Sequence, residues 1–175
     1  MATVLAPMGL KLSAAKTRIS HLDEGFDFLG FRIRRHRKQG TNTKHVYTYP
    51  TKAALATVKA KVRALTCRAT TSLTLTAMLH RLNYILRGWT NYFRHAASAR
   101  AFSYLSSFTW WRVARWLRKK HPRASWKRLR VKYFSGWVPG ENGTSLFYPS
   151  SVTIVRYRYR GAGIPTRWTL QEANA

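Results

Sequence analysis

The chain has 175 residues, of which 32 are Lys or Arg and only five are Asp or Glu, so its formal net charge is +27. A protein with such a charge is expected to bind a polyanion. Charge alone does not distinguish a specific nucleic-acid-binding protein from a membrane-surface protein or a structural, ribosome-like protein. With 45% hydrophobic and 14% aromatic residues, the chain can bury a core, which excludes a disordered basic tail.

Two further classes are excluded by what the sequence contains. A single cysteine, Cys67, excludes an internal disulfide and a Cys-rich zinc site. Arg112 and Arg115 interrupt the most aromatic segment, so no stretch approaches the roughly 18 apolar residues of a membrane span. We therefore expect no integral membrane protein.

The first predicted elements are strands. Residues 26–34 are aromatic and β-branched, and residues 45–49 alternate after a turn-like stretch, which together predict a β-hairpin. Gly30 is expected inside the first strand, at a bulge or a close backbone approach.

A helix is predicted from Thr51, as its N-cap, to about Cys67. Its apolar positions share one face: Leu55, Val58, Val62 and Leu65. A separate basic stripe comprises Lys52, Lys59 and Arg63.

A second helix is predicted from a cap at Thr71 or Ser72 to about Arg94. One face is apolar, comprising Leu75, Met78, Leu79, Leu82, Ile85, Leu86, Trp89 and Phe93. The opposite face is polar and basic without a balancing acid, and we expect it to point outward: His80, Asn83, Arg87, Asn91 and Arg94. Gly88 lies inside this helix, which suggests close approach by another backbone or by RNA.

The third helix is predicted over residues 98–120. Its main apolar face contains Phe102, Leu105, Val113, Trp116 and Leu117, and another side gathers Tyr104, Trp111, Arg115 and Arg118. Ser125 is expected to cap a short helix that runs to Tyr133. Residues 145–148 and 152–159 then predict two strands, the second of which places Arg156 and Arg158 on one face.

Little in the sequence indicates catalysis. A two-metal nuclease or polymerase needs converging carboxylates, whereas Asp23, Glu24 and Asp27 are expected in or beside a solvated turn, and Glu141 and Glu172 in loops. The six histidines form no zinc-binding motif. Cationic side chains that neutralise phosphates and aromatic rings that stack on unpaired bases predict RNA binding instead. For Trp89, Phe93, Trp116 and Trp126 we expect core packing rather than contact with RNA.

Several segments in a fixed order carry a specific resemblance. They are LKLSAAKT (10–17), GFDFLGF (25–31), LNYILRGWTNYFR (82–94), ARAFSYL (99–105), RWLRKKHPRASWKRLRVKYF (115–134) and RYRYRGAGIPTRW (156–168). Together they resemble the C-terminal part of bacterial group II intron reverse transcriptases, namely the end of the palm, the thumb and the maturase region.

The resemblance implies a fold and a set of domains. The expected class is α+β, mainly α, with an N-terminal β-hairpin remnant of a palm, a three-helix thumb-like bundle, and a short C-terminal helix plus β-strands. We expect an end-of-palm segment at 1–49, a thumb bundle at 50–121, a maturase subregion at 122–168 and a tail at 169–175. Lys16 and the Phe28–Leu29–Gly30–Phe31 segment resemble parts beside the polymerase centre that hold the primer end.

The resemblance also implies a function, in which the thumb grips group II intron RNA while the RNA carries out splicing. The catalytic Tyr-Ala-Asp-Asp motif is expected upstream and the endonuclease module downstream, so we expect a truncated maturase that is not an enzyme. We expect Mg²⁺ on the RNA, no cofactor or metal on the protein, and a cytoplasmic, nucleoid- or RNP-associated location in a bacterium. The expected RNA-binding residues include the basic stripe of the first helix, the polar face of the second helix and the side of the third helix that gathers Tyr104, Trp111, Arg115 and Arg118. They also include Arg156 and Arg158 of the last strand and Lys127, Arg128, Arg130 and Lys132 of the short helix.

Two alternatives stay open at this point. The chain could be one half of a split reverse transcriptase that docks onto a separate fingers-palm chain, or a general basic nucleic-acid-binding protein. Expected partners are therefore group II intron RNA, target DNA and a fingers-palm chain, with no membrane.

Overall fold

The computed structural model of the chain describes residues 19–37 and 40–155, together with positions 7 and 13. Its contacts divide the chain into two compact units, residues 1–57 and 58–175, which are described separately. The described residues combine α-helices with two small antiparallel sheets, so the predicted α+β, mainly α class is confirmed. Among the described residues, no helix is long and apolar enough to cross a membrane.

The first unit contains a three-stranded antiparallel sheet of β1 (Phe26–Phe28), β2 (Phe31–Arg37) and β3 (Lys44–Pro50), in that order. The predicted pairing of the segments around 31–34 and 45–49 is confirmed, because Ile33 faces Thr48 in the register of β2 and β3.

The prediction of one strand over residues 26–34 is wrong, because the chain turns back at Leu29 and Gly30. Phe28 pairs with Phe31 across this two-residue turn. Both turn residues have positive φ, 47° at Leu29 and 80° at Gly30, as in the type I′ turns that match the twist of a hairpin. Gly30 thus lies in a turn rather than inside a strand.

Helix α2 (Lys52–Leu65) begins as predicted, since the Ala54 amide donates to Thr51 Oγ1 at 3.0 Å. A short 3₁₀ helix, η2 (Arg68–Ser72), then precedes α3 (Leu75–Phe93). The predicted cap of α3 at Thr71 or Ser72 is therefore wrong. Thr74 is the N-cap, and its side chain accepts from the Ala77 amide at 3.2 Å.

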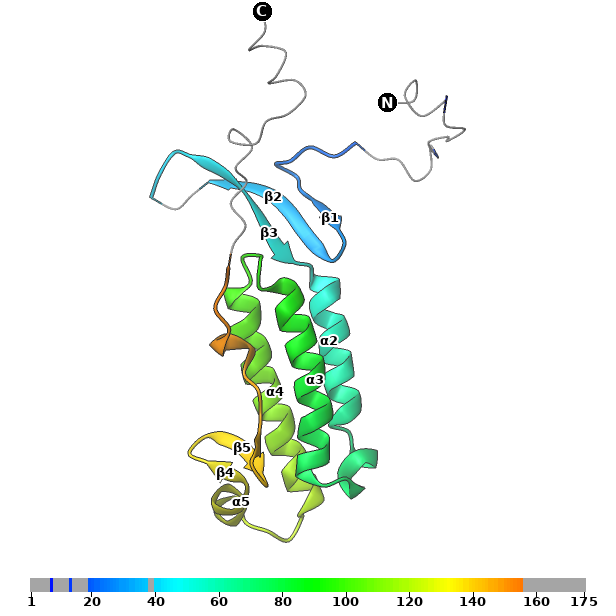
Figure 1. Cartoon of the computed structure of the whole chain (residues 1–175), viewed down its shortest axis with the longest axis vertical. Helices are drawn as coiled ribbons and strands as arrows, with labels where there is room; N and C mark the ends of the chain where they lie inside the picture. The colour runs from blue at the N-terminus through cyan, green and yellow to red at the C-terminus, as the bar shows by residue number, and fades with distance from the viewer. Residues whose placement is uncertain (1–6, 8–12, 14–18, 38–39, 156–175) are drawn as a thin grey trace, which may run out of the picture. The chain divides into compact units, whose positions relative to one another are not determined.

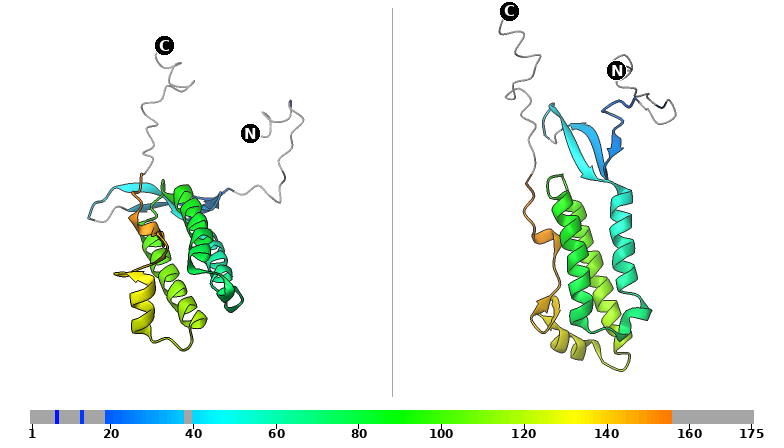
Figure 2. Two further views of the ribbon diagram at one scale, coloured as in Figure 1. Left: turned by 60° about the horizontal axis from the view of Figure 1, so that its bottom comes forward. Right: turned by 45° about the vertical axis from the view of Figure 1, so that its right-hand side comes forward.

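Two predicted helices of the C-terminal half are confirmed. Helix α4 (Ala99–Lys120) fills the expected range, and α5 (Trp126–Tyr133) is capped by Ser125, whose side chain accepts from the Arg128 amide at 3.4 Å. Helices α3 and α4 lie side by side in all three views (Figures 1 and 2).

A second small sheet follows α5, with β4 (Phe134–Ser135), β5 (Val138–Glu141) and β6 (Thr144–Ser145) in that order. The strand predicted at 145–148 is wrong apart from Ser145, because the chain leaves the sheet after β6. Residues 152–155 are not a strand either, and a 3₁₀ turn, η3 (Pro149–Ser151), precedes them. The rest of the predicted strand 152–159, with Arg156 and Arg158, lies outside the described residues.

The core of the second unit contains the apolar positions that helical periodicity selects. On α3 and α4 these positions are at most 3% exposed at Leu75, Met78, Leu79, Leu82, Leu86, Phe93, Phe102, Leu105, Val113, Trp116 and Leu117. Each fully buried side chain of this size contributes roughly 1.5–3 kcal/mol. The indole of Trp116 is fully buried and donates to Thr70 Oγ1 at 3.1 Å, which fastens η2 to α4.

Candidate nucleic-acid interface

Cationic and aromatic side chains from α2 and α4 meet on the surface of the second unit. Lys59 Nζ donates to the Tyr104 hydroxyl at 2.8 Å and lies 5.2 Å from the ring centre of Phe108. The guanidinium of Arg63 lies 5.5 Å from the same ring. We call this set the α2–α4 cluster: Lys59, Arg63, Tyr104, Phe108, Trp111 and Arg115.

The α2–α4 cluster borders a pocket of about 380 Å³. Its lining is Tyr104, Ser107, Phe108, Trp111, Arg112 and Arg115. Tyr104 is 47% and Trp111 58% exposed, which is unusual for rings of this size in a helix that buries another face. Exposed rings beside cations can stack on bases and bind phosphates.

Arg112 lines this pocket and fastens α2 to α4. It donates to the carbonyl and the hydroxyl of Thr66 at 2.9 Å each, so it satisfies the C-terminal end of α2. Desolvation lowers the pKa of Arg112, with smaller contributions from Arg63 and Arg115. An arginine nevertheless stays protonated in water, so the half-buried Arg112 and the exposed Arg115 both give this pocket positive charge.

The structure brings together three of the four residues predicted to share one side of α4. Tyr104, Trp111 and Arg115 line the same pocket, and Arg118 is exposed further along the helix without lining it. Lys59 and Arg63 were predicted as a stripe of another helix, and the structure places both beside Phe108. Phe108 and Arg112 also line this pocket and were not among the predicted site residues. Their spacing of four residues from Tyr104 and from each other could have placed them on this face.

The polar face of α3 differs from the predicted outward surface, because much of it contacts the segment after β5. Asn83 Nδ2 donates to the Ser145 carbonyl at 2.7 Å, and Asn83 Oδ1 accepts from the Phe147 amide at 2.8 Å. His80 Nε2 lies 3.2 Å from Thr144 Oγ1. The amphipathic pattern could not distinguish a face that binds RNA from one that binds another part of the chain.

Three predicted RNA-binding residues near the end of α3 differ in how exposed their side chains are. Arg87 is exposed and its guanidinium lies 4.7 Å from the ring centre of Phe147. Asn91 is exposed, whereas Arg94 is half-buried and its Nε is buried without a hydrogen-bond partner among the described residues. Trp89 is half-buried against Phe93, with ring centres 4.6 Å apart, so its predicted packing role is confirmed.

No protein backbone approaches Gly88 in the described structure. Apart from the neighbouring backbone of its own helix, a methyl group added at this glycine would meet no described atom within 4 Å. The expected close approach by another part of the chain is therefore wrong for the described residues, and contact with RNA stays a prediction.

The basic residues of α5 lie on the surface, and two of them cover aromatic rings. Lys127, Arg128, Arg130 and Lys132 are exposed. The Arg130 guanidinium lies 5.1 Å from the ring centre of Trp137, and Lys132 Nζ lies 5.2 Å from that of Tyr133. Both distances are within the range of cation–π attraction.

The remaining predicted residues belong to the first unit. Lys52 is exposed. In the primer-grip-like segment, Phe28 is 58% and Leu29 69% exposed. The positive φ of Leu29, 47°, is costly for a side chain of this kind. An exposed apolar residue in a strained turn departs from the usual match of residue type to local structure, and such departures are typical of functional sites.

Most of the described acids are bound within the protein. Asp23 accepts from Arg35 at 2.6 and 2.7 Å, which lowers the pKa of the Asp23 carboxyl to about 2, and Asp27 pairs with Arg32 at 3.1 Å. Glu141, predicted in a loop, ends β5 instead, and its carboxylate accepts from the Thr76 amide at 3.1 Å at the start of α3. In the described part of the chain, no three His, Cys, Asp or Glu side chains gather to hold a metal ion.

These features define a basic, mainly α-helical unit whose exposed rings and cations gather on α2, α4 and α5. Residues 55–134 match the family model described as group II intron, maturase-specific domain. This match covers 80 of the 175 residues of the chain. It supports a maturase C-terminal region with a role associated with group II intron splicing. The search of curated proteins returned no match.

Proposed function

We propose that the chain binds group II intron RNA through the α2–α4 cluster and the basic residues of α5, and thereby assists splicing. One observation supports this most strongly. Exposed Tyr104 and Trp111 stand beside Lys59, Arg63 and Arg115. Within the described residues of the second unit, 58–155, Glu141 is the one acid, and its carboxylate accepts from the Thr76 amide at the start of α3.

In this proposal the protein supplies binding and the RNA supplies the reacting groups and the Mg²⁺. Lys and Arg neutralise phosphates where helices of the intron approach each other, which favours compact folds of the RNA. Trp111 and Tyr104 stack on unpaired bases.

The test compares Arg115→Ala with Arg100→Ala, in which an exposed arginine of the same helix outside the cluster is removed. Both proteins, and the unaltered chain, are titrated with a labelled group II intron over a salt series. We expect Arg115→Ala to bind more weakly and to lower the salt slope by roughly 1, and Arg100→Ala to change binding less. Equal effects of the two variants would contradict a specific role of the cluster. Splicing by the same intron, with and without each protein, then tests the assisting role.

The first unit favours a second candidate function, which is docking onto a separate fingers-palm chain of a split reverse transcriptase. Phe28 and Leu29 expose apolar side chains at the turn between β1 and β2, as expected of a surface that contacts a separate fingers-palm chain. Co-purification of this chain with such a partner, lost in Phe28→Ser, would favour this candidate.

A further inference from the structure

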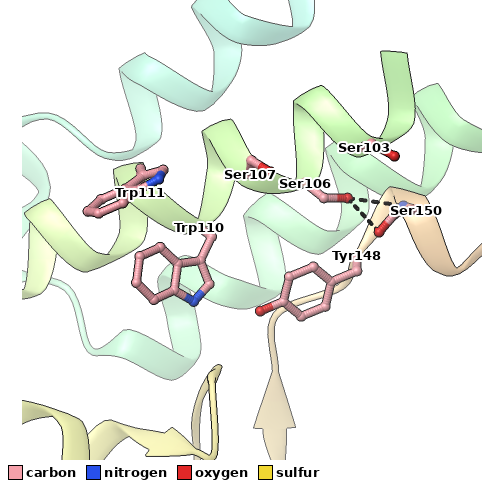
Figure 3. Close-up of a pocket in the computed structure, with 7 residues that line it drawn as sticks. All are labelled: Ser103, Ser106, Ser107, Trp110, Trp111, Tyr148 and Ser150. Atoms are coloured by element: carbon pink, nitrogen blue, oxygen red, sulfur yellow. Dashed lines mark hydrogen bonds between the residues drawn. The ribbon is translucent and has the colours of Figure 1, made fainter. Parts of the chain in front are cut away.

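A second pocket, of about 330 Å³, lies on α4, and Figure 3 shows the residues that line it. Trp111 and Ser107 line both pockets, so the two are contiguous along the helix. The remaining lining of the second pocket is different in chemistry, consisting of Ser103, Ser106, Trp110, Tyr148 and Ser150. We call it the serine–tryptophan pocket.

Two of the three aromatic side chains that line the serine–tryptophan pocket, Trp110 and Tyr148, are held by one carbonyl group. The carbonyl oxygen of Trp137 accepts from Trp110 Nε1 at 2.7 Å and from the Tyr148 hydroxyl at 3.2 Å. Trp111 stands edge-on to Trp110, with ring centres 5.0 Å apart and an angle of 89°. Burial raises the pKa of Tyr148, so its phenol is neutral. Rings held in this way lose little entropy when a flat ligand stacks on them.

The polar groups of the pocket are hydroxyls. Ser106 Oγ donates to Ser150 Oγ at 3.1 Å and accepts from the Ser150 amide at 3.0 Å, which leaves the Ser150 hydroxyl proton for a ligand. Ser103 and Ser107 are exposed beside it. A serine hydroxyl both donates and accepts, so this lining fits neutral groups that have donors and acceptors on one flat edge.

No charged side chain is among the residues that line the serine–tryptophan pocket, whereas Arg112 and Arg115 line its neighbour. A neutral aromatic pocket beside a cationic one matches the two halves of a nucleotide, the base and the phosphate. Stacking accepts every base because each has a π-face.

We propose that the serine–tryptophan pocket binds an unpaired base of RNA, while the adjoining phosphate lies toward Arg115. This inference rests on the proposed function and narrows its ligand to single-stranded segments. A paired base cannot enter, since its edge and both faces are already occupied in the duplex.

The test uses Ser103→Phe, which places a ring in the pocket from an exposed position of α4, and Ala64→Phe, which adds the same ring at an exposed position of α2 outside both pockets. Fluorescence anisotropy of the full chain is measured with short oligoadenylate, oligouridylate and a blunt RNA duplex. We expect Ser103→Phe to weaken single-strand binding roughly 5- to 150-fold, the range of one lost base stack, and to leave duplex binding unchanged. Ala64→Phe should bind both kinds of ligand normally.

A second variant, Ser150→Ala, removes only a hydroxyl and should weaken single-strand binding by a smaller factor. This variant keeps the proposal testable if Ser103→Phe does not fold. If both variants bind single strands as the unaltered chain does, the pocket inference is overturned, even where Arg115→Ala still weakens intron binding. Equal losses for single strands and duplex would overturn it as well. If the unaltered chain binds no RNA, the proposed function and this inference fail together.

Discussion

The side chain of Asn83 connects α3 to the segment after β5 through both ends of its amide. Its nitrogen donates to Ser145 and its oxygen accepts from Phe147. The next residue after Ser145, Leu146, is 3% exposed, so the two hydrogen bonds hold the chain where an apolar side chain enters the core. Asn83 therefore has a structural role that is independent of its predicted contact with RNA.

We expect Asn83→Ala to destabilise the second unit by about 1–3 kcal/mol, because the Phe147 amide and the Ser145 carbonyl lose their partners. Asn91→Ala, at an exposed position of the same helix, should stay within about 0.5 kcal/mol of the unaltered protein. Urea unfolding followed by circular dichroism measures both. Equal stability of the two variants would show that the Asn83 contacts contribute little.

Helices α4 and α5 are joined by a contact between a cap residue and a helix end. His121 follows α4 as its C-cap, and its Nε2 lies 2.9 Å from the hydroxyl of Tyr133, at the end of α5. The two rings are stacked, with centres 5.4 Å apart. Desolvation lowers the pKa of His121, and Lys120 and Lys132 lower it further.

The lowered pKa predicts a pH dependence of stability. Above the ordinary value of 6.5, His121 is neutral in the folded and unfolded chains and the contact is intact. As the pH falls below 6.5, the unfolded chain takes up the proton first, so the free energy of unfolding decreases until the folded form is protonated too. Urea midpoints at pH 7.5 and pH 5.5 measure this. In His121→Gln the free energy of unfolding should decrease less between pH 7.5 and pH 5.5 than in the unaltered protein. An equal decrease in both proteins would show that other groups cause the pH dependence.

At the level of elements, periodicity predicted the helices well and the strands poorly. The apolar positions of α3 and α4 are buried as their spacing indicates, because a helix satisfies its own backbone. In the described residues 145–148 and 152–155 the sequence pattern did not produce the predicted strands, apart from Ser145 in β6, since a strand also needs an edge to pair with. There the chain runs along α3 and α4 instead, where the Val155 amide donates to the Arg94 carbonyl at 3.1 Å.

At the scale of the whole molecule, the charge of +27 predicts how affinity responds to salt. If the chain neutralises about six to eight phosphates, the logarithm of the binding constant should fall against the logarithm of salt concentration with a slope of roughly −4 to −7. Filter binding to a group II intron, an unrelated structured RNA and duplex DNA measures this. A maturase role predicts tighter binding to the intron at every salt concentration, and identical affinities would favour a general basic nucleic-acid-binding protein.

The sequence by itself determined the charge, the helical class, the buried faces and the resemblance to a maturase, because these depend on composition and on local spacing. Only the tertiary structure decided which exposed faces remain available. It covered part of the polar side of α3 with the segment after β5, and it brought Lys59 and Arg63 to the rings of Tyr104 and Phe108, 45 residues apart at the Lys59–Tyr104 contact. The physical reason is that polar helix faces have the same local sequence pattern whether they stay exposed or are covered by a distant segment. Contacts between residues far apart in the sequence decide which of them are covered.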